Sequence, residues 1–367
     1  MNKYDVAAFV WPAYTGDEKR TRIFWEEGYG EWQTLKNSKP ENNGTTWPRK
    51  PLWGYVNEAN PQVMEMQINT ALEHGVNTFI YDWYWYDRRP FLENCLNDGF
   101  LKANNNKKMK FYLMWANHNA TYLWDVRNSY DTSASIWDGA VDRTEFEKIA
   151  RRITEKYFVL DNYYKIDGEP VFMIYDFHNL MKGLGGFKAI QEAFAWFSEM
   201  VKEYGLPGVH FQYDKFDNVP IESAMEEGYD FSPIEMVGKV GFKSMSHYQF
   251  VHFMSMENLT YENAIELMKK EWELCESSNI TYFPHVSIGW DPNIRFKKYD
   301  PNVLRNNTPE NVEKAFKLAK EYIDTHTDRP PLITVNSWNE WTEGSYLEPD
   351  DVNGYGYLEA IKRVFKD

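Results

Sequence analysis

Cysteine is scarce in this sequence: its 367 residues include only Cys95 and Cys275. Both lie in segments with helical periodicity, and neither has a partner at the spacing of a zinc site or a redox motif. The H-E-x-x-H pattern, a Walker loop and a G-x-S-x-G turn are also missing, and the Asp/Asn-rich stretch at 350–354 lacks the distal Glu of a calcium loop. We therefore expect two free thiols, no metal and no cofactor, and neither a P-loop enzyme nor a serine hydrolase.

Long apolar runs are absent as well. No segment approaches the ~20 consecutive apolar residues of a transmembrane helix, and no apolar signal region follows Met1. We expect a soluble protein without membrane insertion. Its compartment stays open: the cytoplasm fits, and so do the periplasm or the cell exterior if a signal peptide has been removed.

Positive charge is in deficit. Lys and Arg number 40 against 55 Asp and Glu, which gives a formal net charge of -15. An acidic surface repels a phosphate backbone, so we expect no nucleic-acid partner. We also expect a monomer.

Aromatic residues, in contrast, are abundant. They make up 17% of the chain, with 15 Trp and 25 Tyr. A core has few partners for so many indole N–H and phenol O–H groups, whereas sugar rings stack on aromatic faces and their hydroxyls bind the polar tips. We expect about half of these residues to pack the core and the others to favour a carbohydrate-binding cleft.

Strand, polar loop and helix alternate about eight times along the chain. The predicted strands are 4–10, 77–81, 110–114, 171–175, 208–213, a weaker 229–235, 281–286 and 332–335, and the predicted helices are 61–74, 90–103, 143–160, 187–204, 261–276, 309–325 and 358–365. This order predicts an α/β fold with a parallel sheet, closed as a (β/α)8 TIM barrel. An open doubly wound sheet is the alternative, but no Gly-rich loop follows the first strand. We see no linker and expect one domain over 1–367.

The connection between the first strand and the first helix is long, about residues 13–58, and a loop of this length in a compact domain is usually functional. It contains Tyr14, a candidate substrate-binding residue. Such a loop could wall off one end of a cleft and impose exo action on a polymer.

The stretch from Pro331 to Asp350 combines a predicted buried strand with a loop rich in carboxylates, amides and tryptophan. Glu340 and Glu343 are three residues apart, so a helical turn would place both carboxyls on one side. Repulsion and burial would separate their pKa values into an acid and a base. Alternatively, one of them only stabilises a helix start. We interpret the pair as catalytic.

Other polar and aromatic residues follow the predicted strands, where the site of a barrel lies. Because strand side chains alternate between two faces, we expect about half of them to face a ligand and the rest to pack. The candidate substrate-binding residues, besides Tyr14, are Asp82, Tyr84, Trp85, Trp115, Asn117, His118, Tyr213, His285, Trp290, Asp291, Asn336, Trp338 and Asn339.

Longer motifs resemble a known family. The run NSWNEWTEGSYLEPD, followed by GYGYLEAIKRVF, resembles the WbsX-like family, which is related to glycoside hydrolase family 99. FIYDWYWY, FYLMWANHN, YKIDGEPVFMIY, LPGVHF and FPHVSIGWDPNIRF match in the same order over nearly the whole chain. Two features depart from the family: its N-terminal aromatic pattern appears only as IFWEEGYGEW, and Thr342 replaces the commoner Ala. They leave the substrate open.

The resemblance implies a (β/α)8 barrel that acts on carbohydrate. In the family 99 enzymes, endo-α-mannosidases, the E-W-x-E motif supplies both catalytic carboxylates. Carried over, Glu340 would be the base that deprotonates the 2-hydroxyl of the sugar, which then forms a 1,2-anhydro sugar. Glu343 would be the acid that protonates the leaving oxygen and later activates water, with net retention.

Three functions remain as hypotheses. The first is a retaining glycoside hydrolase for an α-linked glycan or polysaccharide, and the second is a glycosyltransferase of polysaccharide biosynthesis, as many WbsX-like proteins have been labelled. The third is a carbohydrate-binding protein without catalysis. We find no Asp-x-Asp nucleotide-sugar motif, which favours hydrolysis. The sugar, the linkage, and endo versus exo action stay open.

Overall fold

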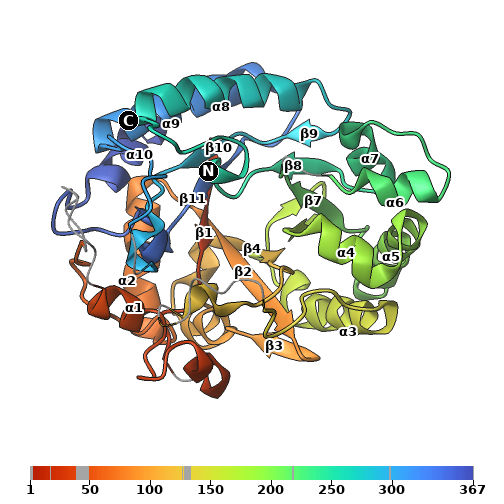
Figure 1. Cartoon of the computed structure of the whole chain (residues 1–367), viewed down its shortest axis with the longest axis horizontal. Helices are drawn as coiled ribbons and strands as arrows, with labels where there is room; N and C mark the ends of the chain where they lie inside the picture. Colours follow the sequence, from red (N-terminus) through yellow and green to blue (C-terminus); the bar gives the residue numbers. More distant parts are fainter. Residues whose placement is uncertain are drawn as a thin grey trace.

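The computed structural model describes residues 3–16, 18–38, 49–125, 127, 134–216, 219–296 and 299–366. Within these ranges a parallel sheet curls into a barrel, and helices surround it (Figure 1). The strand order is β10-β11-β1-β2-β4-β6-β7-β8-β9. These strands are β1 (Asp5–Val10), β2 (Thr78–Tyr86), β4 (Lys110–Trp115), β6 (Glu169–Ile174), β7 (His210–Asp214), β8 (Ser244–Ser246), β9 (Thr281–Tyr282), β10 (His285–Ser287) and β11 (Leu332–Asn336).

The barrel closes through one short segment. β9 pairs with β8 and β10 pairs with β11, and only Phe283 and Pro284 separate β9 from β10. Pro284 cannot donate a ladder hydrogen bond, so the strand is interrupted there. The two halves act as the eighth barrel strand, and the predicted (β/α)8 barrel is confirmed.

The helices lie outside the strands in Figure 1. They are α1 (Trp32–Asn37), α2 (Pro61–His74), α3 (Arg143–Ile153), α4 (Phe177–Leu184), α5 (Phe187–Met200), α6 (Ile221–Glu226), α7 (Pro233–Val240), α8 (Tyr261–Glu276), α9 (Pro309–Thr325) and α10 (Gly356–Phe365). Local signals start several of them: the Thr308 side chain caps α9, and Pro309 occupies its first turn. No helix among the described residues has both the length and the apolar character to cross a membrane.

Short elements complete the chain. The 3-10 and π turns are η1 (Lys19–Ile23), η2 (Cys95–Gly99), η3 (Phe100–Lys102), η4 (Asn106–Lys108), η5 (Tyr122–Trp124), η6 (Thr154–Phe158), η7 (Val201–Tyr204), η8 (Phe250–His252), η9 (Pro292–Ile294) and η10 (Trp341–Glu343). Four short strands lie off the barrel: β3 (Arg89–Phe91), β5 (Lys165–Ile166), β12 (Asn339–Glu340) and β13 (Ser345–Tyr346).

Two predicted elements were wrong. The strand expected at 229–235 is absent, because Pro233 begins α7 and the barrel strand is β8, whose two serines gave no apolar run to detect. The helix expected at 90–103 is instead the hairpin strand β3 followed by π and 3-10 turns. A Cβ on Gly99 would lie 2.0 Å from the Glu58 carbonyl oxygen, so close backbone packing fixes this turn.

Residues 11–60 connect β1 to α2, and of these 17 and 39–48 lie outside the described residues. The described part contains η1 and α1 and packs by aromatic contacts. The Trp32 ring lies 4.0 Å from that of Tyr14 and 6.1 Å from that of Trp341. The segment therefore lies against the turn that follows β11, at the carboxyl end of the barrel.

Candidate active site

The turn after β11 carries the predicted carboxylate pair. β12 and β13 form a small antiparallel ladder, and η10 lies between them. The Ser337 hydroxyl accepts a hydrogen bond from the Glu340 backbone N–H at 2.7 Å, and Gly344 ends η10 with φ +64°. This tight turn keeps Glu340 and Glu343 on the same side, facing one cavity.

The cavity lies at the carboxyl ends of the strands and has a volume of about 170 Å³. Its lining comes from the ends of most of the barrel strands and from the loops after them. The lining residues are Trp11, Asp82, Tyr84, Met114, Ala116, His118, Leu123, Trp124, Tyr175, Tyr248, Arg295, Glu340 and Glu343. Carboxyls and aromatic rings converge here from segments more than 300 residues apart in sequence, Trp11 to Glu343.

Arg295, just after η9, links three carboxylates. Its Nη1 donates to Glu343 Oε1 at 2.6 Å, its Nη2 to Glu340 Oε2 at 3.4 Å, and its Nε to Glu31 Oε1 at 3.2 Å. Arg295 is only 4% exposed. A buried guanidinium that meets several carboxylates in this way both orients them and offsets their charge.

Tyr248 joins a third carboxyl to the pair. Its hydroxyl lies 3.0 Å from Asp82 Oδ2 and 2.9 Å from Glu340 Oε1. A phenol has one proton to donate, so Tyr248 cannot donate a hydrogen bond to two charged carboxylates at once. A proton on Asp82 or on Glu340 resolves this, because that carboxyl can donate to the Tyr248 oxygen.

Burial sets the acidity of these groups. It raises the pKa of Glu340 well above the usual value, and the charge of Glu343 raises it further. Burial also raises the pKa of Glu343, against the lowering effect of Arg295. The pKa of Asp82 is raised well above its usual range by burial, against the Tyr248 hydrogen bond. These carboxyls therefore hold their protons to higher pH than free carboxyls do, and Arg295 favours charge on Glu343.

Aromatic rings form the rest of the wall. The Trp11 ring lies 5.7 Å from that of Tyr84 and 5.3 Å from that of Trp124, and His118 lies 5.7 Å from both Tyr84 and Trp124. Burial lowers the pKa of His118, so its ring is neutral near pH 7. A neutral, partly apolar wall beside carboxyls suits the faces and hydroxyls of a sugar ring.

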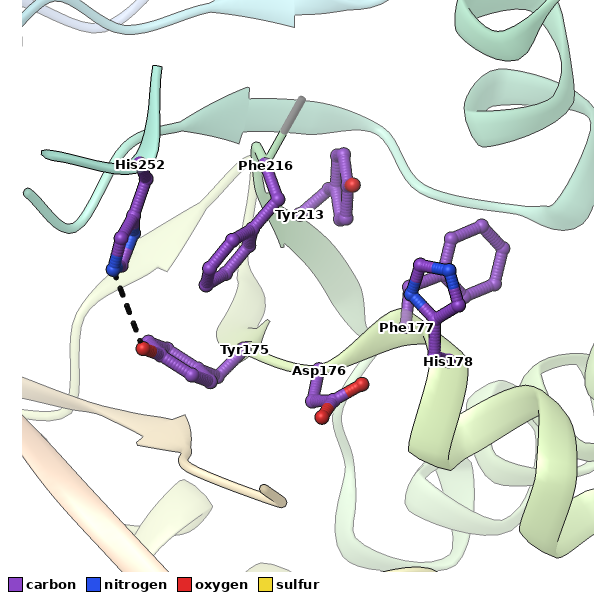
Figure 2. A pocket seen from close by; sticks show the side chains of 7 residues that line it. All are labelled: Tyr175, Asp176, Phe177, His178, Tyr213, Phe216 and His252. Carbon is purple, nitrogen blue, oxygen red and sulfur yellow. Dashed lines mark hydrogen bonds between the residues drawn. The ribbon is translucent and has the colours of Figure 1, made fainter. Parts of the chain in front are cut away.

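A second pocket, of about 350 Å³, adjoins the cavity through Tyr175, which lines both. Figure 2 shows its aromatic lining around Asp176, and the Phe216 and His252 rings stack at 4.1 Å. Tyr175 Oη lies 3.4 Å from His252 Nε2. Together the two pockets provide room for more than one ring at this end of the barrel.

Five of the predicted site residues line the cavity: Asp82, Tyr84, His118, Glu340 and Glu343. Trp85 and Trp115 do not, because the alternation of strand side chains turns them outward. The Trp85 indole donates to Glu145 of α3, and Trp115 packs on Phe172 with ring centroids 6.3 Å apart.

Three predicted polar residues hold backbone instead of facing the cavity. Asn117 pairs with the backbone N–H and C=O of Asp176, both at 2.7 Å. Asn339 does the same with Trp11, at 2.7 and 2.9 Å. Asp291 caps η9 by accepting from the Asn293 N–H at 3.1 Å. Each fixes a loop that carries lining residues.

The remaining predicted residues also lie outside the cavity. His285 bonds to Thr334 and Ser287 inside the barrel, and Asn336 accepts from Gln249. Trp338 donates to Gln67, Tyr14 stacks on Trp32, Tyr213 lines the second pocket, and Trp290 packs partly buried on the core. Most of these side chains pack within the barrel or against it, because the interior of a closed barrel is itself filled with side chains.

The sequence reading missed several residues, chiefly Arg295, Tyr248, Glu31, Trp11, Trp124 and Tyr175. Glu31 accepts from the Trp11 indole at 2.5 Å as well as from Arg295. Arg295 lies within the motif FPHVSIGWDPNIRF, so its charge beside an aromatic and acidic run was an available signal. Trp11 and Tyr175 lie at the ends of the predicted strands 4–10 and 171–175, which was also a signal. Tyr248, Glu31 and Trp124 lie away from the predicted strand ends, and only the closure of the barrel brings them to the site.

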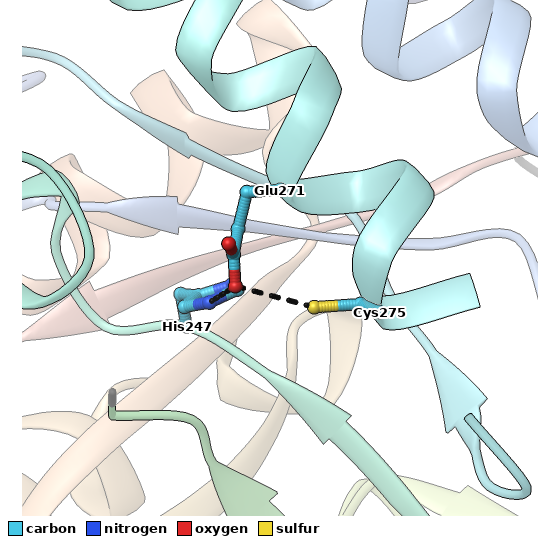
Figure 3. A group of neighbouring side chains, drawn as sticks. All are labelled: His247, Glu271 and Cys275. Carbon is cyan, nitrogen blue, oxygen red and sulfur yellow. Dashed lines mark hydrogen bonds and ion pairs between the residues drawn. The ribbon is translucent and has the colours of Figure 1, made fainter. Parts of the chain in front are cut away.

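One group in the described part of the chain has donors close enough for a metal ion: His247, Glu271 and Cys275, between the loop after β8 and α8 (Figure 3). Glu271 Oε1 already lies 2.5 Å from Lys215 Nζ and 3.2 Å from His247 Nε2. Lysine thus supplies the positive charge that a metal would bring. None of these residues lines the cavity.

Comparison with known families and proteins agrees with this fold. A family described as "Glycosyltransferase WbsX" matches residues 6–361. Two curated relatives, both named "Uncharacterized protein WxcX", come from Xanthomonas campestris pv. campestris strains ATCC 33913 and B100. They are 24% and 23% identical over 344 and 348 residues, covering 93% of this chain and 47% of each relative. The chain spans about half the length of the curated relatives it matches.

Among solved structures, a "Glycoside hydrolase-like protein" matches with a TM-score of 0.60 and 15% identity, over 100% of this chain and 95% of that one. The GH99 endo-alpha-mannosidase from Bacteroides thetaiotaomicron matches with a TM-score of 0.59 and 13% identity, over 98% and 95%. At this identity the likeness establishes a shared barrel fold.

Proposed function

The chain belongs to the glycosyltransferase WbsX family, and from its cavity we propose that it is a retaining glycoside hydrolase that cleaves an α-linked glycan or polysaccharide. The observation that supports this most is the arrangement of Glu340 and Glu343. Both face one small aromatic cavity at the carboxyl end of the barrel, and Arg295 contacts both. Paired carboxyls beside stacking surfaces are the groups that glycoside hydrolysis needs.

In this mechanism Glu340 removes the proton of the sugar 2-hydroxyl, whose oxygen attacks the anomeric carbon. Glu343 gives its proton to the leaving oxygen as the glycosidic bond breaks, which yields a 1,2-anhydro sugar. Glu343 then deprotonates a water molecule that opens this ring, and Glu340 returns a proton to the 2-oxygen. The anomeric configuration is inverted twice and so retained.

Tyr248 allows Glu340 to act as the base. When Asp82 holds the proton of the Asp82–Tyr248–Glu340 chain, the Tyr248 hydroxyl donates to Glu340, which is then charged. Arg295 contacts Glu343 more closely than Glu340 in this structure and favours charge there. The acid role of Glu343 therefore requires substrate to draw Arg295 away from it or to move the proton to it.

The second pocket supports an oligosaccharide as substrate. The cavity of about 170 Å³ is of a size for one ring, and the adjoining pocket of about 350 Å³ offers Phe216, His252 and Tyr213 as further stacking surfaces. In a glycan that occupies the cavity and the second pocket, the bond that is cleaved would lie either between the two pockets or within the cavity. In the second case the second pocket would hold the next sugar unit.

A screen of the purified protein against α-mannans, rhamnose-containing glycans and N-glycans tests this function by the release of new reducing ends. We expect cleavage of one class, with Glu343→Gln losing about 10²–10⁴-fold in kcat. The first product, followed by NMR, should have the α configuration. Full activity of Glu340→Gln and Glu343→Gln would refute the site, and an inverted product would refute the mechanism.

A glycosyltransferase is the second candidate, favoured by the description of the family itself. A nucleotide-diphosphate donor needs positive charge, and among the described lining residues only Arg295 has a fixed positive charge, already shared by three carboxylates. Transfer of sugar from a nucleotide donor to an acceptor, without release of reducing ends from any glycan, would establish this candidate and reject hydrolysis.

A further inference from the structure

Two further buried carboxyls do not line the cavity, and the proposed mechanism assigns them no part. Glu58 precedes α2 and is 0% exposed, and Glu348 follows β13 and is 2% exposed. The two carboxyls face the same amide nitrogen, Gln67 Nε2, so they lie close together. Two buried carboxylate charges at this separation repel each other, which favours a proton on one of them.

The neighbours of the pair supply neutral donors. Gln67 Nε2 lies 3.1 Å from Glu58 Oε1 and 2.7 Å from Glu348 Oε1, so one amide touches both carboxyls. Asn339 Nδ2 donates to both oxygens of Glu58, at 3.1 and 3.0 Å. The Trp341 indole donates to Glu348 Oε2 at 2.6 Å. Among the described residues, no lysine or arginine forms an ion pair or hydrogen bond with either carboxyl.

The titratable groups that face the pair are weak acids. Cys95 of η2 donates to Glu58 Oε2 at 3.7 Å, and its pKa is raised well above the usual value by burial and by Glu58. Tyr81 of β2 and Tyr14 also lie near Glu58, and burial raises the pKa of both phenols. All three stay neutral near pH 7, so none of them offsets a second negative charge.

The pair holds the residues on either side of the proposed base. Asn339 and Trp341 flank Glu340, and each donates to one carboxyl of the pair. Asn339 also binds the backbone of Trp11, which lines the cavity. Two negative charges at Glu58 and Glu348 would repel each other and separate these contacts.

We propose that Glu58 and Glu348 share a proton and thereby act as positioning residues for the turn that carries Glu340 and Glu343. The role in catalysis rests on the proposed function, whereas the shared proton does not. Burial supports the shared proton, because it raises the pKa of Glu58 to about 7. Burial and the charge of Glu58 also raise the pKa of Glu348 well above its usual value.

The first test measures the shared proton without any substrate. Both folded-state pKa values exceed the ~4.3 of an unfolded Glu, so the native pair binds more protons and wild type loses stability as pH rises above that value. In Glu348→Gln an amide hydrogen replaces the proton. We expect the unfolding constant of wild type, relative to this variant, to rise by up to about tenfold per pH unit between roughly pH 5 and 7 and beyond.

The matched control is Glu145→Gln, because Glu145 is also buried and also accepts from an indole, that of Trp85, but is paired with Lys148. Its stability relative to wild type should not acquire this pH dependence. The free energy of unfolding of each protein is measured by denaturant titration at several pH values in this range. An equal change with pH in wild type and Glu348→Gln would overturn the shared proton.

The second test measures positioning. Glu348→Ala, if folded by circular dichroism, should lower kcat by about 100-fold with little change in KM, because a displaced base still leaves the sugar bound. Glu348→Gln should restore kcat to within about tenfold of wild type. If Glu348→Ala does not fold, the kcat of Glu348→Gln becomes the test of positioning. A decrease in kcat as large as that caused by Glu340→Gln would overturn the positioning role.

These tests separate the two proposals. A pH-dependent difference in stability with no glycan cleavage by wild type would leave the shared proton standing and reject the hydrolase. Glycan cleavage by wild type, together with equal pH dependence of stability in wild type and Glu348→Gln, would support the hydrolase and reject the shared proton.

Discussion

At the scale of single residues, Arg295 decides how much negative charge the cavity tolerates. Its one positive charge meets Glu31, Glu340 and Glu343, all of which are largely removed from water. Without it, the carboxyl pair would retain protons over a wider pH range, because a neighbouring cation lowers a carboxyl pKa. In the proposed mechanism Arg295 therefore lowers the pH at which the carboxyls of the pair become charged.

For Arg295→Gln we expect a loss of about 10²–10³-fold in kcat/KM at pH 7. The lower limb of the pH–rate profile should move to higher pH, since the carboxyl pKa values rise once the positive charge is removed. Arg329→Gln is the control, because Arg329 is also little exposed and pairs with Glu276 far from the cavity lining. An unshifted limb in Arg295→Gln would contradict this role.

At the scale of elements, the connection from β1 to α2 places Glu31 beside Arg295. The backbone makes a close approach at Gly30, whose φ is +65°, and the Glu31 N–H donates to the Ala13 carbonyl at 3.0 Å. A Cβ on Gly30 would lie 1.8 Å from that same oxygen. The left-handed turn and the missing side chain together allow this contact.

Gly30→Ala should therefore lower the free energy of unfolding by more than about 3 kcal/mol and reduce activity, as Glu31 moves away. Gly54→Ala is the matched control in the same connection: its φ is +74°, but nothing lies within 4 Å of the added Cβ. There we expect only the conformational cost, about 1–2 kcal/mol. Equal costs in thermal unfolding would show that the approach to Ala13 is not decisive.

At the scale of the whole molecule, barrel closure puts two pockets side by side. Tyr175, which directly follows β6, lines both pockets. Phe216, from the loop after β7, and His252, of η8, lie beyond it (Figure 2). The loops after neighbouring parallel strands meet at one end of a barrel, so an extended binding surface arises there.

Removing the Phe216 ring should weaken binding in the second pocket alone. For Phe216→Ala we expect kcat/KM to fall by roughly 5–50-fold on an oligosaccharide, in line with the loss of one stacking contact. An aryl glycoside of a single sugar, which fills only the cavity, serves as the control and should be cleaved almost as well as by wild type. An equal loss on both substrates would assign Phe216 to the structure of the cavity itself.

The barrel and the carboxylate motif could both be predicted from the amino-acid sequence. The strands of a parallel barrel are buried on both faces, so each appears in the sequence as an apolar run between helices. Glu340 and Glu343 are close in sequence, so one turn brings them together. The sequence also placed Asp82, Tyr84 and His118, which lie in the loops just after the predicted strands 77–81 and 110–114. The errors at 229–235 and 90–103 arose where polar strand residues or close backbone packing overrode the local pattern.

Which side chains meet in the cavity depends on the folding of the whole chain. Arg295, Tyr248 and Glu31 reach Glu340 from three distant segments, and no local spacing predicts a contact that depends on the register of a closed sheet. The same register turns Trp85 and Trp115 outward, since one step along a strand exchanges its two faces. The carboxyl pair could be predicted from sequence, whereas its acidity could not, because burial and neighbouring charges set it.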